Sequence, residues 1–130
     1  MRFLQPQGWP RPKGYANGVA ARGSLVFVSG AVGWNAQEKF ASIDFVDQVR
    51  QALLNIVAIL HEGKAKPEHI ARITWYVVDK SEYLAAAKEV GEVYRAIIGP
   101  HYPAMTVVEV SGLLEANARV EIEVTAVVPD

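Results

Sequence analysis

The amino-acid sequence predicts an α+β fold in which two helices cover one face of a mixed β-sheet, in the order ββαβαββ. Two segments carry apolar residues at helical spacing, and several shorter segments are rich in β-branched residues. One of the short segments, residues 119–127, alternates strictly between apolar and polar side chains. We therefore expect a two-layer sandwich formed by a single domain over residues 1–130.

The composition suits a globular protein and argues against several classes of function. Hydrophobic residues make up 51% of the 130-residue chain, enough for one core. A formal net charge of −1 gives no attraction to a phosphate backbone, so we expect no nucleic-acid partner. The chain contains no cysteine, which excludes disulfides and thiolate metal sites.

The sequence shows no sign of an export signal or a membrane anchor. Residues 1–10 contain one short apolar run before Gln5 and Pro6, far less than the core of a signal peptide. No stretch approaches the roughly eighteen consecutive apolar residues of a membrane-spanning helix. We expect a cytoplasmic protein with no membrane partner.

The N-terminal part is predicted to be an extended arm followed by a β-hairpin. Residues 1–14 hold three of the seven prolines, which favours an irregular arm over a helix or strand. The apolar segments 18–21 and 24–29 flank Arg22-Gly23, where glycine permits the positive φ of a tight turn. These two segments are therefore expected to pair with each other.

Two amphipathic helices and three further strands follow. Residues 44–62 carry apolar side chains three and four positions apart, and Gly63 is suited to end that helix. Asp79 and Ser81 are candidate N-caps of a second helix that continues to Gly99-Pro100. The remaining strands are predicted at residues 70–78, 104–111 and 119–127.

One face of the predicted sheet has no helix to cover it. We expect Met105, Val107, Glu121 and one side of the strand containing Trp75 to lie on that face. A surface that mixes apolar and charged groups in this way is unfavourable for a monomer, so we expect the chain to associate with copies of itself. The alternative is a sheet face exposed to water.

A set of short motifs occurs in a fixed order over residues 14–128. The motifs are Gly14-Tyr15, Leu25-Val-Phe-Val-Ser-Gly30, Gln48 with Gln51-Ala-Leu-Leu-Asn55-Ile, Thr74-Trp-Tyr-Val-Val-Asp79, Tyr94, Pro103-Ala104, Val108-Glu-Val and Val120-Glu-Ile-Glu123. Each motif is weak alone, but together and in this order they resemble the RidA/YjgF family. The resemblance implies a chorismate-mutase-like (ferredoxin-like) fold and a homotrimer with ligand clefts between its subunits.

The resemblance also implies a function, the removal of ammonia from imines or enamines. Glu121 matches the family's acidic residue, which positions the attacking water or moves its proton. Tyr15 matches a tyrosine able to hydrogen-bond the substrate nitrogen or the water, and Gly30 matches a position where the ligand approaches the backbone. Ser29, the neighbour of Gly30, is a further candidate for substrate binding. No cofactor is implied.

The sequence departs from the family pattern at one informative position. The imine-deaminating members carry a Pro-Ala-Arg sequence whose guanidinium binds the substrate carboxylate through two hydrogen bonds. This chain has Pro103-Ala104-Met105 instead. Methionine is uncharged and flexible, so it can line an apolar pocket but cannot bind a carboxylate in that way. We expect weak or no activity on small 2-imino acids.

Four other residues are candidates for contact with a ligand. Val107 follows Met105 on the same strand face, and His101 precedes it by four residues. Arg119 is expected on the same face as Glu121, where it either binds a carboxylate or pairs with a neighbouring side chain. Trp34 either closes the pocket or packs within its own loop. For Glu121 and Tyr15 too, a structural role at a subunit interface is the alternative.

Two functions are alternatives to the hydrolysis of imines in such a cleft. The first is a non-catalytic trimer that binds or senses a small metabolite in the same cleft. The second is an endoribonuclease or translation inhibitor, an activity that has been associated with the family, which the acidic pI of about 6.3 makes less favourable. The three histidines show no metal-ligand spacing, so no metal site is expected.

Overall fold

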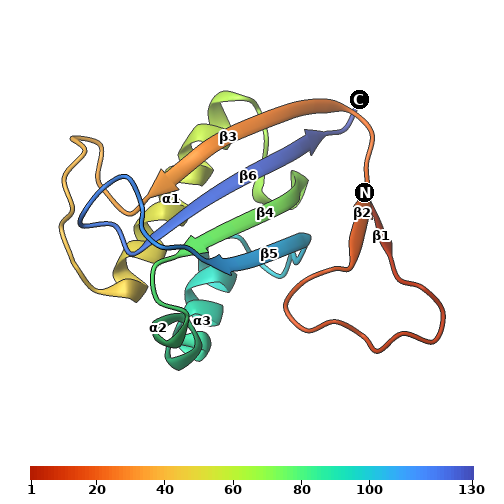
Figure 1. Cartoon of the computed structure of the whole chain (residues 1–130). Helices are drawn as coiled ribbons and strands as arrows, with labels where there is room; N and C mark the ends of the chain where they lie inside the picture. The colour runs from red at the N-terminus through yellow and green to blue at the C-terminus, as the bar shows by residue number, and fades with distance from the viewer.

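The computed structural model covers residues 1–130 and contains a four-stranded sheet with all helices on one side (Figure 1). The strands are β3 (Ser24–Val32), β4 (Ile70–Val77), β5 (Ala104–Glu109) and β6 (Val120–Val128), in the spatial order β3-β6-β4-β5. β5 runs parallel to β4, and the other neighbours are antiparallel. The predicted α+β fold with a mixed sheet is therefore confirmed.

The helices are α1 (Phe45–Glu62), α2 (Lys80–Ala85) and α3 (Ala87–Ile97), with a short 3-10 turn at Pro67–His69. The first predicted helix matches α1, which the Asp44 side chain caps. The second predicted helix is divided at Ala86, whose backbone has φ −99° and ψ 12°. The hydrogen-bond ladder continues across this residue, since Val90 N–H donates to Ala86 C=O. No glycine or proline marks the division, so the sequence pattern does not reveal it. No helix combines the length and the apolar character that crossing a membrane requires.

The predicted N-terminal hairpin is wrong, because the two segments have other partners. β2 (Gly18–Ala20) pairs with β1 (Arg2–Leu4), a strand within the arm that was expected to be irregular, and β3 pairs with β6. Figure 1 shows the β1-β2 ribbon beside the main sheet. A side chain at Gly23 would meet the Val128 carbonyl oxygen at 1.9 Å, so this glycine lets the chain pass the end of β6. β6 offers β3 a longer partner than the three residues of β2.

The core lies between the sheet and α1 and α3. The predicted alternation in β6 is confirmed, because its inward side chains are all buried while the intervening ones are partly exposed. The inward side chains are Val120, Ile122, Val124 and Ala126. They pack in one cluster with the apolar faces of α1 and α3.

The register of β5 corrects one expectation about the uncovered face. Met105 is paired with Ile73 and Val107 with Trp75, and both partners are buried under the helices. Side chains at paired positions of neighbouring strands point to the same face, so Met105 and Val107 lie on the helix-covered side and the prediction for them is wrong. Glu121 alternates with the buried residues of β6 and lies on the uncovered face as expected.

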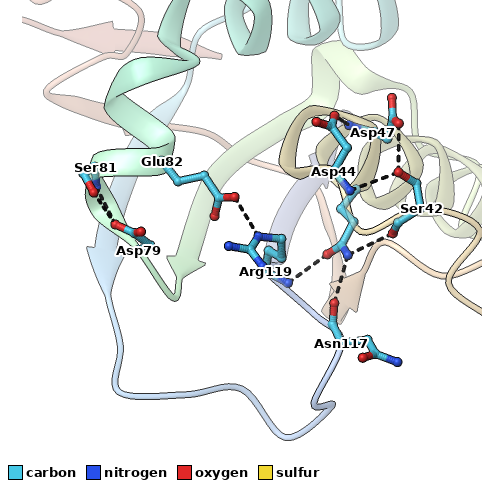
Figure 2. Close-up of polar contacts among 9 residues, drawn as sticks. Ser42, Asp44, Asp47, Asp79, Ser81, Glu82, Asn117 and Arg119 are labelled. Atoms are coloured by element: carbon cyan, nitrogen blue, oxygen red, sulfur yellow. Dashed lines mark hydrogen bonds and ion pairs between the residues drawn. The ribbon is translucent and has the colours of Figure 1, made fainter.

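A buried glutamine connects the first helix to two loops, and Figure 2 labels the residues that it contacts, Ser42, Asn117 and Arg119. Gln48 is 1% exposed, and its amide group donates to the carbonyls of Ser42 (3.1 Å) and Asn117 (2.9 Å). Its carbonyl accepts from the Arg119 backbone N–H at 2.8 Å. A side chain at Gly33 would meet the backbone of Gln48 at 2.6 Å, so glycine permits the close approach of this loop. The network fixes where β6 begins.

Replacing Gln48 with leucine should therefore destabilise the fold. The substitution removes three partly buried hydrogen bonds of the Gln48 side chain, and we expect a loss of about 3 kcal/mol in the free energy of unfolding. Urea denaturation followed by circular dichroism measures it. The control is Gln37→Met, because Gln37 is exposed and should change stability by less than about 0.5 kcal/mol. Equal stability of the two variants would contradict the role of Gln48.

Candidate functional site

A cavity of about 390 Å³ opens between α3 and the strands β4 and β5, of which β5 forms the edge of the sheet. Twelve residues line it, nine of them hydrophobic. They are Lys13, Gly14, Tyr15, Trp75, Tyr83, Ala87, Val90, Gly91, Tyr94, Tyr102, Met105 and Val107. Three of the residues predicted for the site, Tyr15, Met105 and Val107, therefore lie together.

The helical wall of the cavity comes from one face of α3. Ala87, Val90, Gly91 and Tyr94 have the i, i+3, i+4, i+7 spacing that places residues on one side of a helix. A side chain added at Gly91 would meet no atom within 4 Å. The absence of a side chain at this position therefore leaves open volume.

The opposite wall comes from the N-terminal segment, far away in the sequence. The Ala16 backbone N–H donates to the carbonyl of Pro103 at 2.9 Å, and Ala16 forms a single parallel bridge with Ala104. This contact holds Tyr15 at the free edge of β5, beside Met105. Gly14 has a φ of 76°, a conformation that favours glycine.

Two of the cavity tyrosines, Tyr83 and Tyr94, are largely buried phenols. Tyr94 donates its hydroxyl hydrogen to the His101 carbonyl and stacks on Tyr102 at a ring-centre distance of 5.4 Å. Burial raises the pKa of Tyr94 and of Tyr83, because an apolar environment disfavours the phenolate. Trp75 is 2% exposed, and its indole N–H has no hydrogen-bond partner.

A second group of predicted residues gathers on the opposite face of the sheet. A Cβ at Gly30 would lie 2.3 Å from Glu121 Oε2, so the carboxylate rests directly against the glycine backbone. Ser29 is exposed next to them on β3. Neither oxygen of Glu121 forms a hydrogen bond or an ion pair, whereas its neighbour Glu123 accepts a bond of 2.6 Å from the Tyr76 hydroxyl, which raises the pKa of Tyr76. Of these two carboxylates, Glu121 is the one without an internal partner.

The structure thus separates the predicted site into two halves. The cavity with Tyr15 and Met105 is on the helix-covered side, and Glu121 with Gly30 is on the uncovered side. The sheet lies between them. A single copy of the chain cannot bring Glu121 to a ligand bound beside Met105.

Arg119 lies in neither half. Its Nε donates to Glu82 Oε1 at 2.7 Å (Figure 2), and this hydrogen bond raises the pKa of Arg119. Of the two roles expected for Arg119, the structure therefore contains the second, in which the arginine pairs with a neighbouring side chain. The ion pair links α2 to the start of β6.

Trp34 and His101 also lie outside the cavity. The Trp34 ring packs against Phe40 at 5.8 Å within its loop. His101 Nε2 lies 2.7 Å from the Ile70 carbonyl oxygen, and its ring contacts Phe3 of β1 edge-on. Within one copy, both side chains have structural partners.

Sequence reasoning did not identify several lining residues. Gly91 could have been found, because it belongs to the apolar stripe of the second predicted helix and is its smallest member. Lys13 could not, since only the contact between Ala16 and Pro103 places it near the cavity. Trp75 was expected in the core, where it lies, and it also lines the cavity.

Comparison with known proteins places the chain in a well-defined group. The family model described as endoribonuclease L-PSP matches residues 10–128. A RutC family protein of Aquifex aeolicus is 35% identical over 130 residues, covering 98% of this chain and 99% of the relative. A 2-iminobutanoate/2-iminopropanoate deaminase of Dermatophagoides farinae is 26% identical over 120 residues, covering 92% and 90%.

Solved structures agree with the sequence matches. The crystal structure of YyfB, a Rid family protein of Yersinia pestis, superposes with a TM-score of 0.85 at 26% identity, covering 98% of each chain. The structure of Escherichia coli TdcF with bound serine gives a TM-score of 0.68 at 30% identity, again covering 98% of each chain. The fold is therefore that of the Rid proteins.

The buried tyrosines make a prediction about alkaline pH. In the unfolded chain Tyr94 ionises near pH 10, whereas in the folded protein its pKa is raised, so the folded state keeps a proton that the unfolded state loses. Stability from this group is complete below about pH 10 and falls as the pH rises above it. Urea denaturation at pH 9 and pH 11 should show a smaller loss for Tyr94→Phe than for the unsubstituted protein. An equal loss in both proteins would contradict the burial of this hydroxyl.

Proposed function

The chain belongs to the RidA/YjgF family, whose family model is described as endoribonuclease L-PSP, and from this premise we propose a homotrimer that hydrolyses an imine or enamine in clefts between its subunits. One observation carries the proposal: the cavity with Tyr15 and Met105 and the free carboxylate of Glu121 lie on opposite faces of the sheet. Both take part in one site only where the cavity of one copy meets the uncovered face of another.

The composition of the uncovered face supports such an assembly. Phe27 is 71% exposed and Leu25 is 59% exposed, both on β3. Burying side chains of this size against another copy contributes roughly 25 cal/mol per Å² of apolar surface. A closed ring of identical copies covers the face on every subunit equally. The relative from Dermatophagoides farinae is named a deaminase of 2-imino acids, and TdcF was solved with bound serine. Both favour a small metabolite as the ligand.

The chemistry needs a base, a water molecule and an electrophilic carbon held close together. Glu121 accepts a proton from water as the water oxygen forms a bond to the imine carbon, and that proton passes to the nitrogen. Tyr15 donates a hydrogen bond to the nitrogen and keeps it oriented. The C–N bond of the resulting carbinolamine then breaks while its hydroxyl proton is transferred to the departing nitrogen. Ammonia and a carbonyl compound are the products, and no oxidant or reductant takes part.

The cavity determines which imines are favoured. Met105 gives no charge to bind a carboxylate beside the reacting carbon, so small 2-imino acids are poor substrates. Larger ligands, cyclic or less anionic, gain binding energy from the apolar walls instead. A trimer that binds such a ligand without hydrolysing it is the rival function, and it uses the same cavity.

Restoring a cation at position 105 should increase activity on a small substrate. We expect Met105→Arg to raise kcat/KM for 2-iminopropionate by about tenfold or more, because a charge-assisted bidentate contact contributes roughly 1.5–3 kcal/mol. A coupled assay of ammonia release measures it. Leu114→Arg is the control. Leu114 is 97% exposed in a loop, so the arginine in this variant adds the same charge away from the cavity. A high rate on 2-iminopropionate without the substitution would contradict the specificity.

Mixing two inactive variants tests whether each site is shared between copies. Glu121→Gln removes the base and should lower turnover by about 10²-fold or more, and Gly91→Phe fills the cavity. Trimers refolded from an equal mixture should regain about a quarter of the normal turnover, because that fraction of sites pairs an intact cavity with an intact carboxylate. Light scattering on each preparation confirms the oligomeric state.

The controls for this experiment separate its outcomes. Glu123→Gln alters the neighbouring carboxylate on the same face and should keep more activity than Glu121→Gln. If Glu121→Gln binds product analogues normally and no preparation releases ammonia, the protein is a binder and hydrolysis is excluded. A monomer at micromolar concentration, or no recovery on mixing, would contradict the shared site.

A further inference from the structure

The cavity contains a single charged side chain, and that residue has no recognised role. Among its twelve lining residues only Lys13 carries a charge at neutral pH, since the remainder are apolar residues, glycines and tyrosines. The pKa of both Tyr83 and Tyr94 is raised, so neither becomes an anion. Within one copy, Lys13 is therefore the only charged group that a ligand in the cavity meets.

Lys13 has no partner within its own chain. The three ion pairs of the structure are Arg22–Asp130, Arg50–Asp47 and Arg119–Glu82. No side-chain hydrogen bond involves the lysine either. Its ammonium group is exposed at the cavity mouth, where the aliphatic stem can lie along the wall while the charge stays hydrated. A cation in this state can bind an anion without breaking an existing pair.

The position of Lys13 is fixed by the backbone around it. The Ala16–Pro103 hydrogen bond of 2.9 Å attaches this segment to the edge of β5, and Gly14 makes a left-handed turn between Lys13 and Tyr15. The lysine and the tyrosine therefore belong to the same wall. Their side chains meet a ligand from the side of the N-terminal segment.

Part of the cavity wall is suited to an apolar group. Gly91 leaves space in which an added side chain would meet nothing within 4 Å. Val90, Met105 and Val107 surround this region with apolar surface. The indole N–H of Trp75 is buried and has no acceptor, and an unpaired buried donor is costly.

We infer that Lys13 binds the acidic group of the ligand at the cavity mouth, and that Gly91 leaves room in the same cavity for a bulky apolar or aromatic body. This inference rests on the proposed function, in that it takes the cavity as the ligand site. Among the larger ligands expected for the cavity, it selects those that carry one acidic group and a large apolar substituent. A small 2-imino acid has no such substituent and gains nothing from the open space beside Gly91.

Calorimetric titration with three ketones tests the inference without requiring turnover. The probes are phenylpyruvate, pyruvate and phenylacetone, the last having a methyl group in place of the carboxylate of phenylpyruvate. Phenylpyruvate should bind most tightly. In Lys13→Gln its affinity should fall about tenfold or more, the effect expected from losing one charge-assisted contact, while the affinity for phenylacetone stays unchanged.

Two further variants complete the experiment. Lys88→Gln is the matched control, because Lys88 is exposed on α3 and does not line the cavity, and it should bind phenylpyruvate normally. Gly91→Phe should lose affinity for phenylpyruvate by more than tenfold if the apolar body occupies that space. Its circular dichroism spectrum and its oligomeric state must match those of the unsubstituted protein.

The outcomes distinguish this inference from the proposed reaction. If phenylpyruvate binds and Lys13→Gln weakens it selectively, the inference holds even where no imine is hydrolysed. If imines are hydrolysed but Lys13→Gln and Lys88→Gln behave alike with every probe, the inference is overturned and the reaction remains. Absence of phenylpyruvate binding, or equal affinity for phenylpyruvate and pyruvate, also overturns it.

Discussion

The register between β4 and its two neighbours is the constraint on which the arrangement of this protein depends. It pairs Trp75 with Val107 on one side and with Ile122 on the other, and so places all three on the face covered by the helices. Glu121, one position away from Ile122, is necessarily directed to the other face. The separation of the two halves of the site follows from this alternation, and no rearrangement of a side chain can remove it.

Each face has its own chemical character. The helix-covered side has a nearly neutral cavity that aromatic and apolar groups surround, with one lysine at its mouth. The uncovered side carries two carboxylates on β6, one bound to Tyr76 and one without a partner. A ligand between two copies would therefore have apolar surface on one side and a free base on the other. This combination suits a reaction that needs an activated water beside a shielded carbon.

The loops at one end of the sheet are fixed by polar contacts. Gln48 bonds to three backbone groups from two loops, and the Arg119–Glu82 ion pair connects the same region to α2. A buried amide that bonds several backbone groups fixes the position of those segments as well as stabilising the fold, because any polar group left without its hydrogen bond raises the free energy. They place the start of β6, and with it the position of Glu121 two residues later. A predicted ligand residue, Arg119, thus contributes to the geometry of the site from outside it.

The sequence alone determined the element types and most of their boundaries. Strict alternation in residues 119–127 and helical spacing in residues 44–62 are local properties, and both elements formed where the pattern indicated. The family motifs pointed to Tyr15 and to position 105, and the strand pattern added Val107; the fold brings all three into one cavity. Glu121 was placed on the correct face.

Strand partners and cavity walls were decided only by the tertiary structure. The hairpin expected at residues 18–29 did not form, because β6 offered β3 a better partner at a distance in sequence that no local pattern encodes. In the same way, the face that Met105 occupies depends on its pairing with Ile73, and the position of Lys13 depends on a single backbone bond near Pro103. Periodicity describes how a segment alternates, but its register against another segment depends on the packing of the whole core.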